Sequence, residues 1–166
     1  GIMFLTPAKS VVEKIAAIIK KINATIPVIV GGHHSTFCST DILTNSHIDF
    51  AIKGEGETPL LNLANEIISG NHNWSAVPGL TYRNEVGSIR STKDADFIFD
   101  LDSLPFAARD RVLHCDYQAY RTHYLSTARG CPYTCTFCSD SSMWRHKVRR
   151  RCVEHVVSEL RMLTAE

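Results

Sequence analysis

Two short apolar runs, at 27–30 and 48–52, constrain the fold of this chain more than any other feature. The first is continuous, contains β-branched residues and ends at the glycine pair Gly31-Gly32, and the second has a similar character. Strands that are apolar on both faces are typical of a parallel sheet covered by helices. Both runs are therefore predicted to be buried strands.

Helices are expected on either side of these strands. Ser10 and Glu13 form a capping box, after which apolar residues recur at helical spacing as far as position 22. Thr58 and Pro59 mark the start of another helix, which Gly70 ends. With a further strand expected at 2–5, this alternation predicts an open α/β sheet.

The pattern changes after Gly70. Residues 79–92 alternate weakly around a turn at 84–87, which predicts a hairpin. Residues 93–118 show no sustained period and are expected to form a surface connection. A short strand at 124–127 and a helix at 153–163 with an apolar face then follow. We therefore predict three parts, at 1–75, 76–119 and 120–166.

The composition excludes several classes of protein. The 166 residues include 18 Lys and Arg against 17 Asp and Glu, and a charged fraction of 21% argues against disorder. No apolar run reaches the roughly 18–20 residues of a membrane span, and the first residues do not resemble a secretory signal. A cytoplasmic, reducing compartment is therefore expected.

Positive charge is concentrated between positions 145 and 151, which hold five Lys and Arg residues. Three interpretations remain open: a nucleic-acid patch, a solvated loop, or a counter-charge for a nearby anion. Nucleic acid is the least favoured of these, because the rest of the chain has an acidic balance and few interleaved aromatic residues.

Three of the six cysteines, Cys131, Cys135 and Cys138, fall within eight positions. Soft thiolates at this spacing suit an iron–sulfur cluster, Zn or Cu(I). A structural zinc site closes with four protein ligands, whereas a cubane held by three cysteines leaves one iron with an open position. Gly130 is expected to permit a tight backbone approach to such a cluster, and Pro132 to stiffen the loop.

Residues 131–138 resemble the Cys-x3-Cys-x-aromatic-Cys signature of the radical S-adenosylmethionine (SAM) enzymes, with Phe137 as the aromatic residue. The resemblance implies that the three cysteines bind a 4Fe–4S cluster and that Phe137 contributes to cofactor binding. The open iron would chelate SAM, whose reductive cleavage yields a 5′-deoxyadenosyl radical that abstracts hydrogen from the substrate. It also implies that this loop follows the first strand of a partial TIM-like barrel.

The segments 30–36, 53–59, 77–80 and 101–105 extend the resemblance to the radical SAM subfamily that has an N-terminal cobalamin-binding domain. Its members include methyltransferases and anaerobic magnesium-protoporphyrin IX monomethyl ester cyclases. The fold implied is the C-terminal part of a Rossmann-like (flavodoxin-like) cobalamin-binding domain, a linker hairpin, and the first βα unit of the radical SAM barrel.

Five residues are implied as cobalamin contacts: Gly31, Gly32, His34, Gly54 and Glu55. For Gly31 and Gly32, a tight turn after a strand is a nearly equal interpretation, and the downstream segments favour cobalamin. His33 and His34 are expected to be hydrogen-bonded loop histidines rather than cobalt ligands. Glu55 and Glu57 are expected to be solvated charges, and no catalytic residue is assigned.

Departures from the family pattern lead us to expect a fragment. Two βα units of the cobalamin domain and the later barrel strands have no counterpart, so the chain alone is expected to be inactive. The expected parent is an oxygen-sensitive oxidoreductase, cyclase or methyltransferase that uses a 4Fe–4S cluster, SAM and cobalamin. Its partners would be a small-molecule substrate and a reducing protein such as flavodoxin or ferredoxin.

The contrasting hypothesis is a non-catalytic zinc module that docks RNA or a protein through residues 145–151. Its fourth zinc ligand would be Cys152 or His146. Cys38 and Cys115 are expected to be inert, small apolar side chains.

Overall fold

The computed structural model describes residues 1–111 and 124–164, and it divides at 97/98 into two units, Gly1–Phe97 and Ile98–Glu166. The expected inertness of Cys115 lies outside the described residues, as does the predicted boundary at 119/120.

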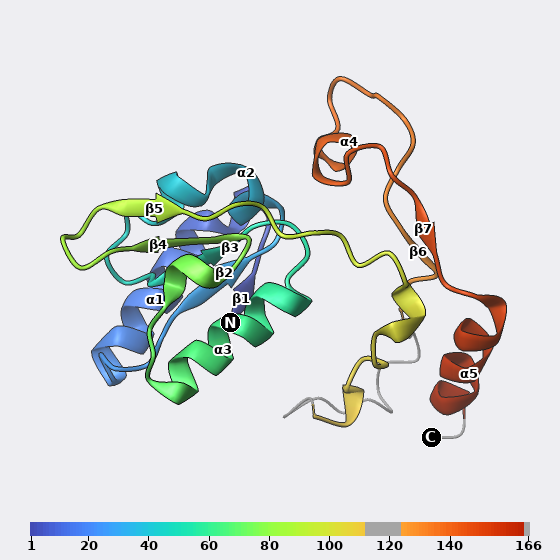
Figure 1. Ribbon diagram of the computed structural model, residues 1–166, viewed down its shortest axis with the longest axis horizontal. Coiled ribbons are helices and arrows are strands. Elements are labelled where there is room, and N and C mark those ends of the chain that lie inside the picture. Colours follow the sequence, from blue (N-terminus) through green and yellow to red (C-terminus); the bar gives the residue numbers. More distant parts are fainter. Residues whose placement is uncertain (112–123, 165–166) are drawn as a thin grey trace. The chain divides into compact units, whose positions relative to one another are not determined.

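The first unit is built on one five-stranded sheet with the order β1-β2-β3-β4-β5 (Figure 1). The first three strands are parallel, as the apolar runs predicted: β1 (Ile2–Met3), β2 (Ile29–Gly31) and β3 (Phe50–Ile52). The predicted hairpin forms β4 (Leu80–Arg83) and β5 (Ile89–Ser91). Because β4 pairs antiparallel with β3, the hairpin extends the same sheet.

Three α-helices pack on the two faces of this sheet: α1 (Lys9–Ile22), α2 (His33–Ile42) and α3 (Glu57–Ser69). Residues of α1 and α2 share one core with β2 and β3, whose buried members include Val12, Ala16, Val30, Ile42 and Ala51. Residues of α3 form a second core on the opposite face, where Leu63 packs with Phe50, Ile52, Val77 and Leu80. Successive β3 residues therefore point into different cores, as a strand buried on both sides requires.

The predicted caps of two helices are wrong. The short 3-10 helix η1 (Thr6–Ala8) leads into α1 one residue before Ser10, so Ser10 lies inside the first turn and makes no capping bond. Helix α3 starts at Glu57, before Thr58, with Gly56 at its N-cap. In both helices the chain reaches helical geometry before the expected capping residue. The predicted end of α3 is confirmed, because Gly70 has a φ of 70°.

Only part of the apolar stripe of α1 is buried. Val12 and Ala16 pack on the sheet, whereas Val11, Ile18 and Ile22 are exposed. A helix lying on a sheet buries a narrow face, and the apolar residues of α1 cover a wider arc than that face.

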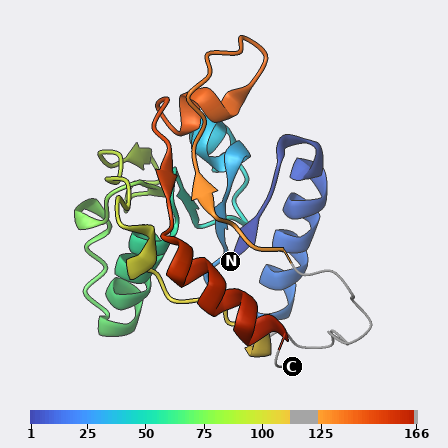
Figure 2. The same ribbon diagram turned by 90° about the vertical axis from the view of Figure 1, so that its right-hand side faces the viewer.

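The second unit begins with the short helices η3 (Leu101–Ser103) and η4 (Arg109–Arg111). The strands and α-helices that follow are β6 (Ala128–Arg129), α4 (Ser139–Met143), β7 (Arg149–Arg150) and α5 (Val153–Thr164). Strands β6 and β7 form an antiparallel pair (Figure 2). The predicted helix at 153–163 is confirmed, but the strand predicted at 124–127 begins four residues later, where its partner strand is available.

The apolar face predicted for α5 is partly wrong. Val153 is 72% exposed and Leu160 is exposed as well, whereas Glu159 is only 4% exposed. Within the described ranges, no helix has the length and apolar character needed to cross a membrane.

Candidate cofactor-binding loops

The loops that follow β2 and β3 lie at one edge of the first sheet. Strands β2 and β3 are parallel, so Gly31-Gly32 and Lys53-Gly54 both follow the carboxyl ends of strands. In open α/β sheets this edge is where ligands bind. The structure therefore brings together the two segments that carry the five predicted cobalamin contacts.

Hydrogen bonds hold both loops in place. The Thr36 hydroxyl in the first turn of α2 donates to the Gly32 carbonyl at 2.9 Å and accepts from the Gly54 N–H at 3.0 Å. The residue before Gly54 is held as well: the Lys53 N–H donates to the Gly79 carbonyl at 2.8 Å, and the Lys53 ammonium donates to Asp94 at 2.9 Å. The backbone at Lys53-Gly54 is therefore attached both to α2 and to the segment around the hairpin.

The glycines in these loops have different structural roles. A Cβ added at Gly31 or at Gly54 would meet nothing within 4 Å, so both positions face open space. A Cβ at Gly32 would lie 2.8 Å from a Met3 side-chain carbon and 2.9 Å from the Phe4 carbonyl, and the φ of Gly32 is 92°. Gly32 is therefore required by its contact with the first strand, whereas Gly31 and Gly54 leave room for a ligand.

His34 and Glu55 are both buried, which corrects two predictions. His34 lies in the first turn of α2, not in a loop; its Nδ1 lies 3.1 Å from the Thr6 hydroxyl, and its ring contacts Phe4. Glu55 is 5% exposed, so its prediction as a solvated charge is wrong, while Glu57 is exposed as predicted. A carboxylate this deeply buried is stable only with polar partners.

Two buried polar atoms beside these loops have no hydrogen-bond partner among the residues that the structure describes: the Nε2 of His34 and the hydroxyl of Ser35. Native structures leave few such atoms unsatisfied. Together with the open positions at Gly31 and Gly54, they fit a large polar cofactor that lies over this edge of the sheet.

A hollow of about 440 Å³ adjoins the same loops, and its lining is mainly apolar. It is lined by Met3, Phe4, Leu5, Pro7, Ala8, Gly32 and His33. Most ligand sites have a mainly apolar lining, so this hollow suits the body of a large organic cofactor.

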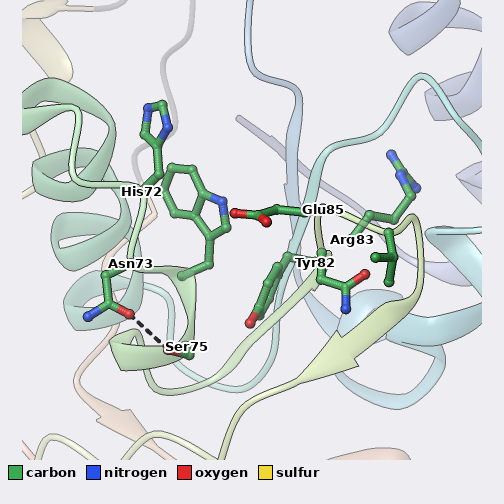
Figure 3. Close-up of a pocket in the computed structure, with 9 residues that line it drawn as sticks. His72, Asn73, Ser75, Tyr82, Arg83 and Glu85 are labelled. Carbon is green, nitrogen blue, oxygen red and sulfur yellow. Dashed lines mark hydrogen bonds between the residues drawn. The ribbon is translucent and has the colours of Figure 1, made fainter.

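A second hollow lies at the amino ends of the parallel strands, away from the predicted site residues (Figure 3). Tyr82, Arg83 and Glu85 come from the hairpin, and His72 stacks on Trp74. Arg83 points away from Glu85 and donates to the carbonyls of Leu43 and Ile48, so it is not available to a ligand. None of the predicted functional residues lines this hollow.

The three clustered cysteines lie between β6 and α4, on a loop without regular structure. Cys135 is exposed, Cys131 and Cys138 are half-buried, and none of the three forms a disulfide. The Cys138 N–H donates to the Cys135 carbonyl at 3.2 Å, and the Cys138 carbonyl accepts from the Ser141 hydroxyl at 3.0 Å. The last cysteine is therefore attached to the first turn of α4. Phe137 is 90% exposed, so it is free to contact a bound cofactor.

Among the described residues, no three His, Cys, Asp or Glu side chains lie close enough together to hold a metal ion. The three thiols are therefore not gathered around one point. As a donor set they still fit a cluster, because they are reduced, share one loop of eight residues, and lie on backbone without a helix or strand between 131 and 138.

The base of the cysteine loop is closed by Gly130 and the strand pair. Gly130 has a φ of 99°, and a Cβ there would lie 1.8 Å from the Lys147 carbonyl oxygen. The close approach that Gly130 makes is therefore to the Lys147 carbonyl, whereas the predicted approach was to the cluster. The ring Nδ1 of His146 lies 3.2 Å from the Tyr133 carbonyl and adds a second link across the loop.

Replacing Gly130 by alanine is expected to separate β6 from β7. No side chain can occupy a position 1.8 Å from a backbone oxygen, so the strand pair must shift. We expect the Gly130→Ala chain to lose most of its cluster-binding capacity, measured as iron bound after anaerobic reconstitution. Gly87→Ala, whose added Cβ has open space at a similar φ of 78°, is the control. Iron binding equal to that of the control would contradict the structural role of Gly130.

The basic segment 145–151 is not one solvated patch. Arg145, Lys147 and Arg150 are exposed, but Arg149 is 6% exposed and donates to the Ile98 carbonyl at 2.7 Å. Arg151 is engaged in an ion pair with Glu159 and donates to the Ser126 carbonyl at 2.9 Å. The prediction of a solvated loop is therefore wrong for Arg149 and Arg151, which serve as internal supports of the second unit.

Glu159 is the centre of a charged network in the second unit. Its carboxylate accepts from Arg109 at 2.8 Å and from Arg151 at 2.5 Å. Burial disfavours the ionised form of Glu159, but the two arginines outweigh this effect and hold the pKa of the carboxyl below its usual value of 4.5. The network joins the segment before the cysteine loop to α5.

Asp102 provides a second link to the start of α5. Its carboxylate accepts from the Cys152 N–H at 2.9 Å and lies 2.9 Å from the His155 ring. The Cys152 hydrogen bond is the main reason why the pKa of Asp102 is lowered. Asp102 thus binds the N–H of Cys152, the residue that precedes α5, while the Cys152 Sγ accepts from the His155 N–H in the first turn of the helix.

Sequence reasoning did not single out Thr36 or Glu159. For Thr36, the indication of a role in the sequence is its place inside the segment that resembles a cobalamin domain. For Glu159 the sequence gives no indication of burial, because a glutamate on an amphipathic helix is ordinarily solvent-exposed.

Comparison with known proteins shows what these loops are similar to. Residues 1–64 match the family model of the B12 binding domain. The chain is therefore related, through its first unit, to proteins that bind B12.

Longer similarities extend over nearly the whole chain. An uncharacterised methyltransferase of Pyrococcus horikoshii is 33% identical over 100% of this chain and 36% of its own length. The anaerobic magnesium-protoporphyrin IX monomethyl ester cyclase of Rubrivivax gelatinosus is 32% identical over 100% of this chain and 31% of its own length. The chain thus spans about a third of these curated relatives.

A solved structure shows the same arrangement of elements. The radical SAM methyltransferase TsrM of Kitasatospora setae, with cobalamin and a 4Fe–4S cluster bound, matches with a TM-score of 0.68 and 25% identity. The match covers 93% of this chain and 32% of TsrM. The chain is a relative of the cobalamin-binding radical SAM methyltransferases and cyclases, as the resemblance predicted.

Proposed function

We propose that this chain carries the cobalamin-facing loops and the cluster-binding loop of a radical SAM enzyme. The observation that carries the proposal is that one chain combines a segment matching the B12 binding domain with three free cysteines on a single loop. The proposed cofactors are cobalamin, a 4Fe–4S cluster and SAM. The proposed reaction class is hydrogen abstraction from an unreactive carbon, followed by methyl transfer or oxidative ring closure.

Cys131, Cys135 and Cys138 would hold the cluster through their thiolates, and a cubane held by three thiolates would keep one iron open for SAM. Bound together, the cluster and SAM supply the one-electron chemistry that starts the reaction. The chain's own contribution is to close the loop at Gly130 and to attach Cys138 to α4 through Ser141. Phe137, next to the last cysteine, offers an exposed ring for the cofactor.

Gly31, Gly54 and His34 would serve cobalamin at the carboxyl edge of the sheet. The glycines leave the edge free of side chains, so a large ring system can approach the backbone there. Glu55 would support the loop from its buried position. A small-molecule substrate, an electron-donating protein such as flavodoxin or ferredoxin, and a cytoplasmic location complete the proposal.

The alternative zinc module would dock RNA or a partner through residues 145–151. Two of its five basic side chains are occupied inside the second unit, which weakens this alternative. Anaerobic reconstitution with iron and sulfide separates the two hypotheses. We expect a brown chain that binds about four irons, as one cubane requires. One tightly bound zinc with no uptake of iron would overturn the radical SAM proposal.

Replacing Gly31 by valine is expected to weaken corrinoid binding. The new side chain enters the open space at the sheet edge, so the affinity for hydroxocobalamin should fall at least about tenfold while the unfolding midpoint stays unchanged. Gly32→Val is less informative, because Gly32 contacts Phe4 and the variant would disturb the fold itself.

The matched control is Gly1→Val, where an added Cβ makes only an ordinary contact of 3.8 Å with Ile29. Binding is measured by absorbance on the chain and on a polypeptide extended at its N-terminus, where the resemblance places two further strand–helix units. Unchanged affinity in Gly31→Val, or no corrinoid binding by either wild-type polypeptide, would contradict the proposed site.

A further inference from the structure

The Thr36 side chain forms hydrogen bonds with both the loop after β2 and the loop after β3. It is half-buried in the first turn of α2. The hydroxyl donates to the Gly32 carbonyl at 2.9 Å and accepts from the Gly54 N–H at 3.0 Å. One oxygen atom thus links the loop after β2 to the loop after β3.

The two bonds use the hydroxyl in both of its capacities. Its single proton is committed to the Gly32 carbonyl, which leaves its lone pairs for the Gly54 N–H. The first bond alone is a common feature of a threonine in a helix, since it joins Thr36 to the residue four positions earlier. The second bond is not local, because it spans 18 residues and reaches a different strand–loop unit.

Gly54 depends on this contact more than an ordinary loop residue would. Its φ is 71°, and its Cβ position faces open space, so no packing of its own holds the backbone there. The preceding residue, Lys53, is anchored to Gly79 and Asp94. The Thr36 hydroxyl supplies the corresponding attachment on the other side of Gly54.

We infer that Thr36 is a positioning residue of the corrinoid site, which sets the spacing between the Gly31-Gly32 and Gly54-Glu55 loops. This inference rests on the proposed function. Thr36 itself need not touch the cofactor. By holding both loops before the ligand arrives, it removes an ordering cost that binding would otherwise include.

Thr36→Val tests this inference with little change in shape, because valine replaces the hydroxyl by a methyl group. We expect exchange of the Gly54 amide hydrogen to accelerate about tenfold in the ligand-free chain, since its acceptor is lost. In the N-terminally extended polypeptide, the affinity for hydroxocobalamin should fall about tenfold. Thr36→Ser, which keeps the hydroxyl, should restore both values.

Thr44→Val is the matched control, because the Thr44 hydroxyl donates at 2.7 Å to the Asp41 carbonyl without linking two loops. It should leave both readouts unchanged. Wild-type affinity in Thr36→Val, or an unchanged Gly54 exchange rate, would overturn the inference. Failure of the wild-type polypeptide to bind any corrinoid would instead overturn the proposed function, while the Gly54 exchange rate would still report on the hydroxyl link.

Discussion

Replacing Cys135 by alanine is expected to reduce the iron bound after anaerobic reconstitution from about four atoms per chain to well below one. Cys135 is the exposed, middle member of the triplet, so its loss leaves two thiols seven residues apart. Two thiolates cannot hold a cubane that already has one open iron. Bound iron, acid-labile sulfide and the visible absorbance of the cluster are the measurements.

Cys152→Ala is the control for this experiment, and it also tests the zinc alternative. The Asp102 carboxylate and burial outweigh a hydrogen bond from the His155 N–H, so the pKa of the Cys152 thiol is raised and the thiolate is disfavoured. We therefore expect Cys152→Ala to bind as much iron as the wild type. Loss of metal in both variants would favour a four-ligand site and contradict the open-iron proposal.

Replacing Glu159 by glutamine is expected to cause the largest loss of stability in the second unit. Glu159 is 4% exposed and pairs with both Arg109 and Arg151. Breaking a buried ion pair by removing one partner costs on the order of 3 kcal/mol. For a unit of this size, that corresponds to a decrease of more than about 10 °C in the unfolding midpoint.

The measurement uses the fluorescence of Trp144, which lies in the second unit, with Trp74 replaced by phenylalanine. Glu154→Gln on the same helix is the control, because Glu154 is exposed. A midpoint for Glu159→Gln within about 2 °C of this control would show that the network contributes little.

The same network predicts how stability depends on pH. The folded-state pKa of Glu159 lies below the ordinary value of 4.5, so its contribution is fully present above that value. The contribution is lost as the pH falls from about 4.5 through the lower folded-state pKa. Glu159→Gln should therefore show a flatter acid-unfolding curve than the wild type.

The alternation of strands and helices in the first unit was predictable because its signals are local. Apolar runs without alternation require burial on both faces, and the structure places them as the adjacent parallel strands β2 and β3 inside the five-stranded sheet. The spacing of Cys131, Cys135 and Cys138 is equally local, so the sequence alone indicated a shared ligand. Helix starts were less predictable, since a residue before the expected cap can adopt helical geometry first.

What the sequence could not supply are the contacts between distant segments. Gly32 and Gly130 look alike as loop glycines, but one is required by the first strand and the other by the carbonyl of Lys147. Glu159 has the local pattern of a surface residue and becomes buried only because two arginines converge on it.

The class of fold, the cysteine loop and the relationship to cobalamin-binding radical SAM proteins could be predicted from the sequence, because these depend on residue type and spacing along the chain. The folded structure was needed to show that the Thr36 hydroxyl joins two loops and that Arg149 and Arg151 make contacts inside the second unit. The Thr36–Gly54 and Arg149–Ile98 hydrogen bonds join residues that are 18 and 51 positions apart. Burial of a polar side chain likewise depends on the whole folded chain rather than on any one segment.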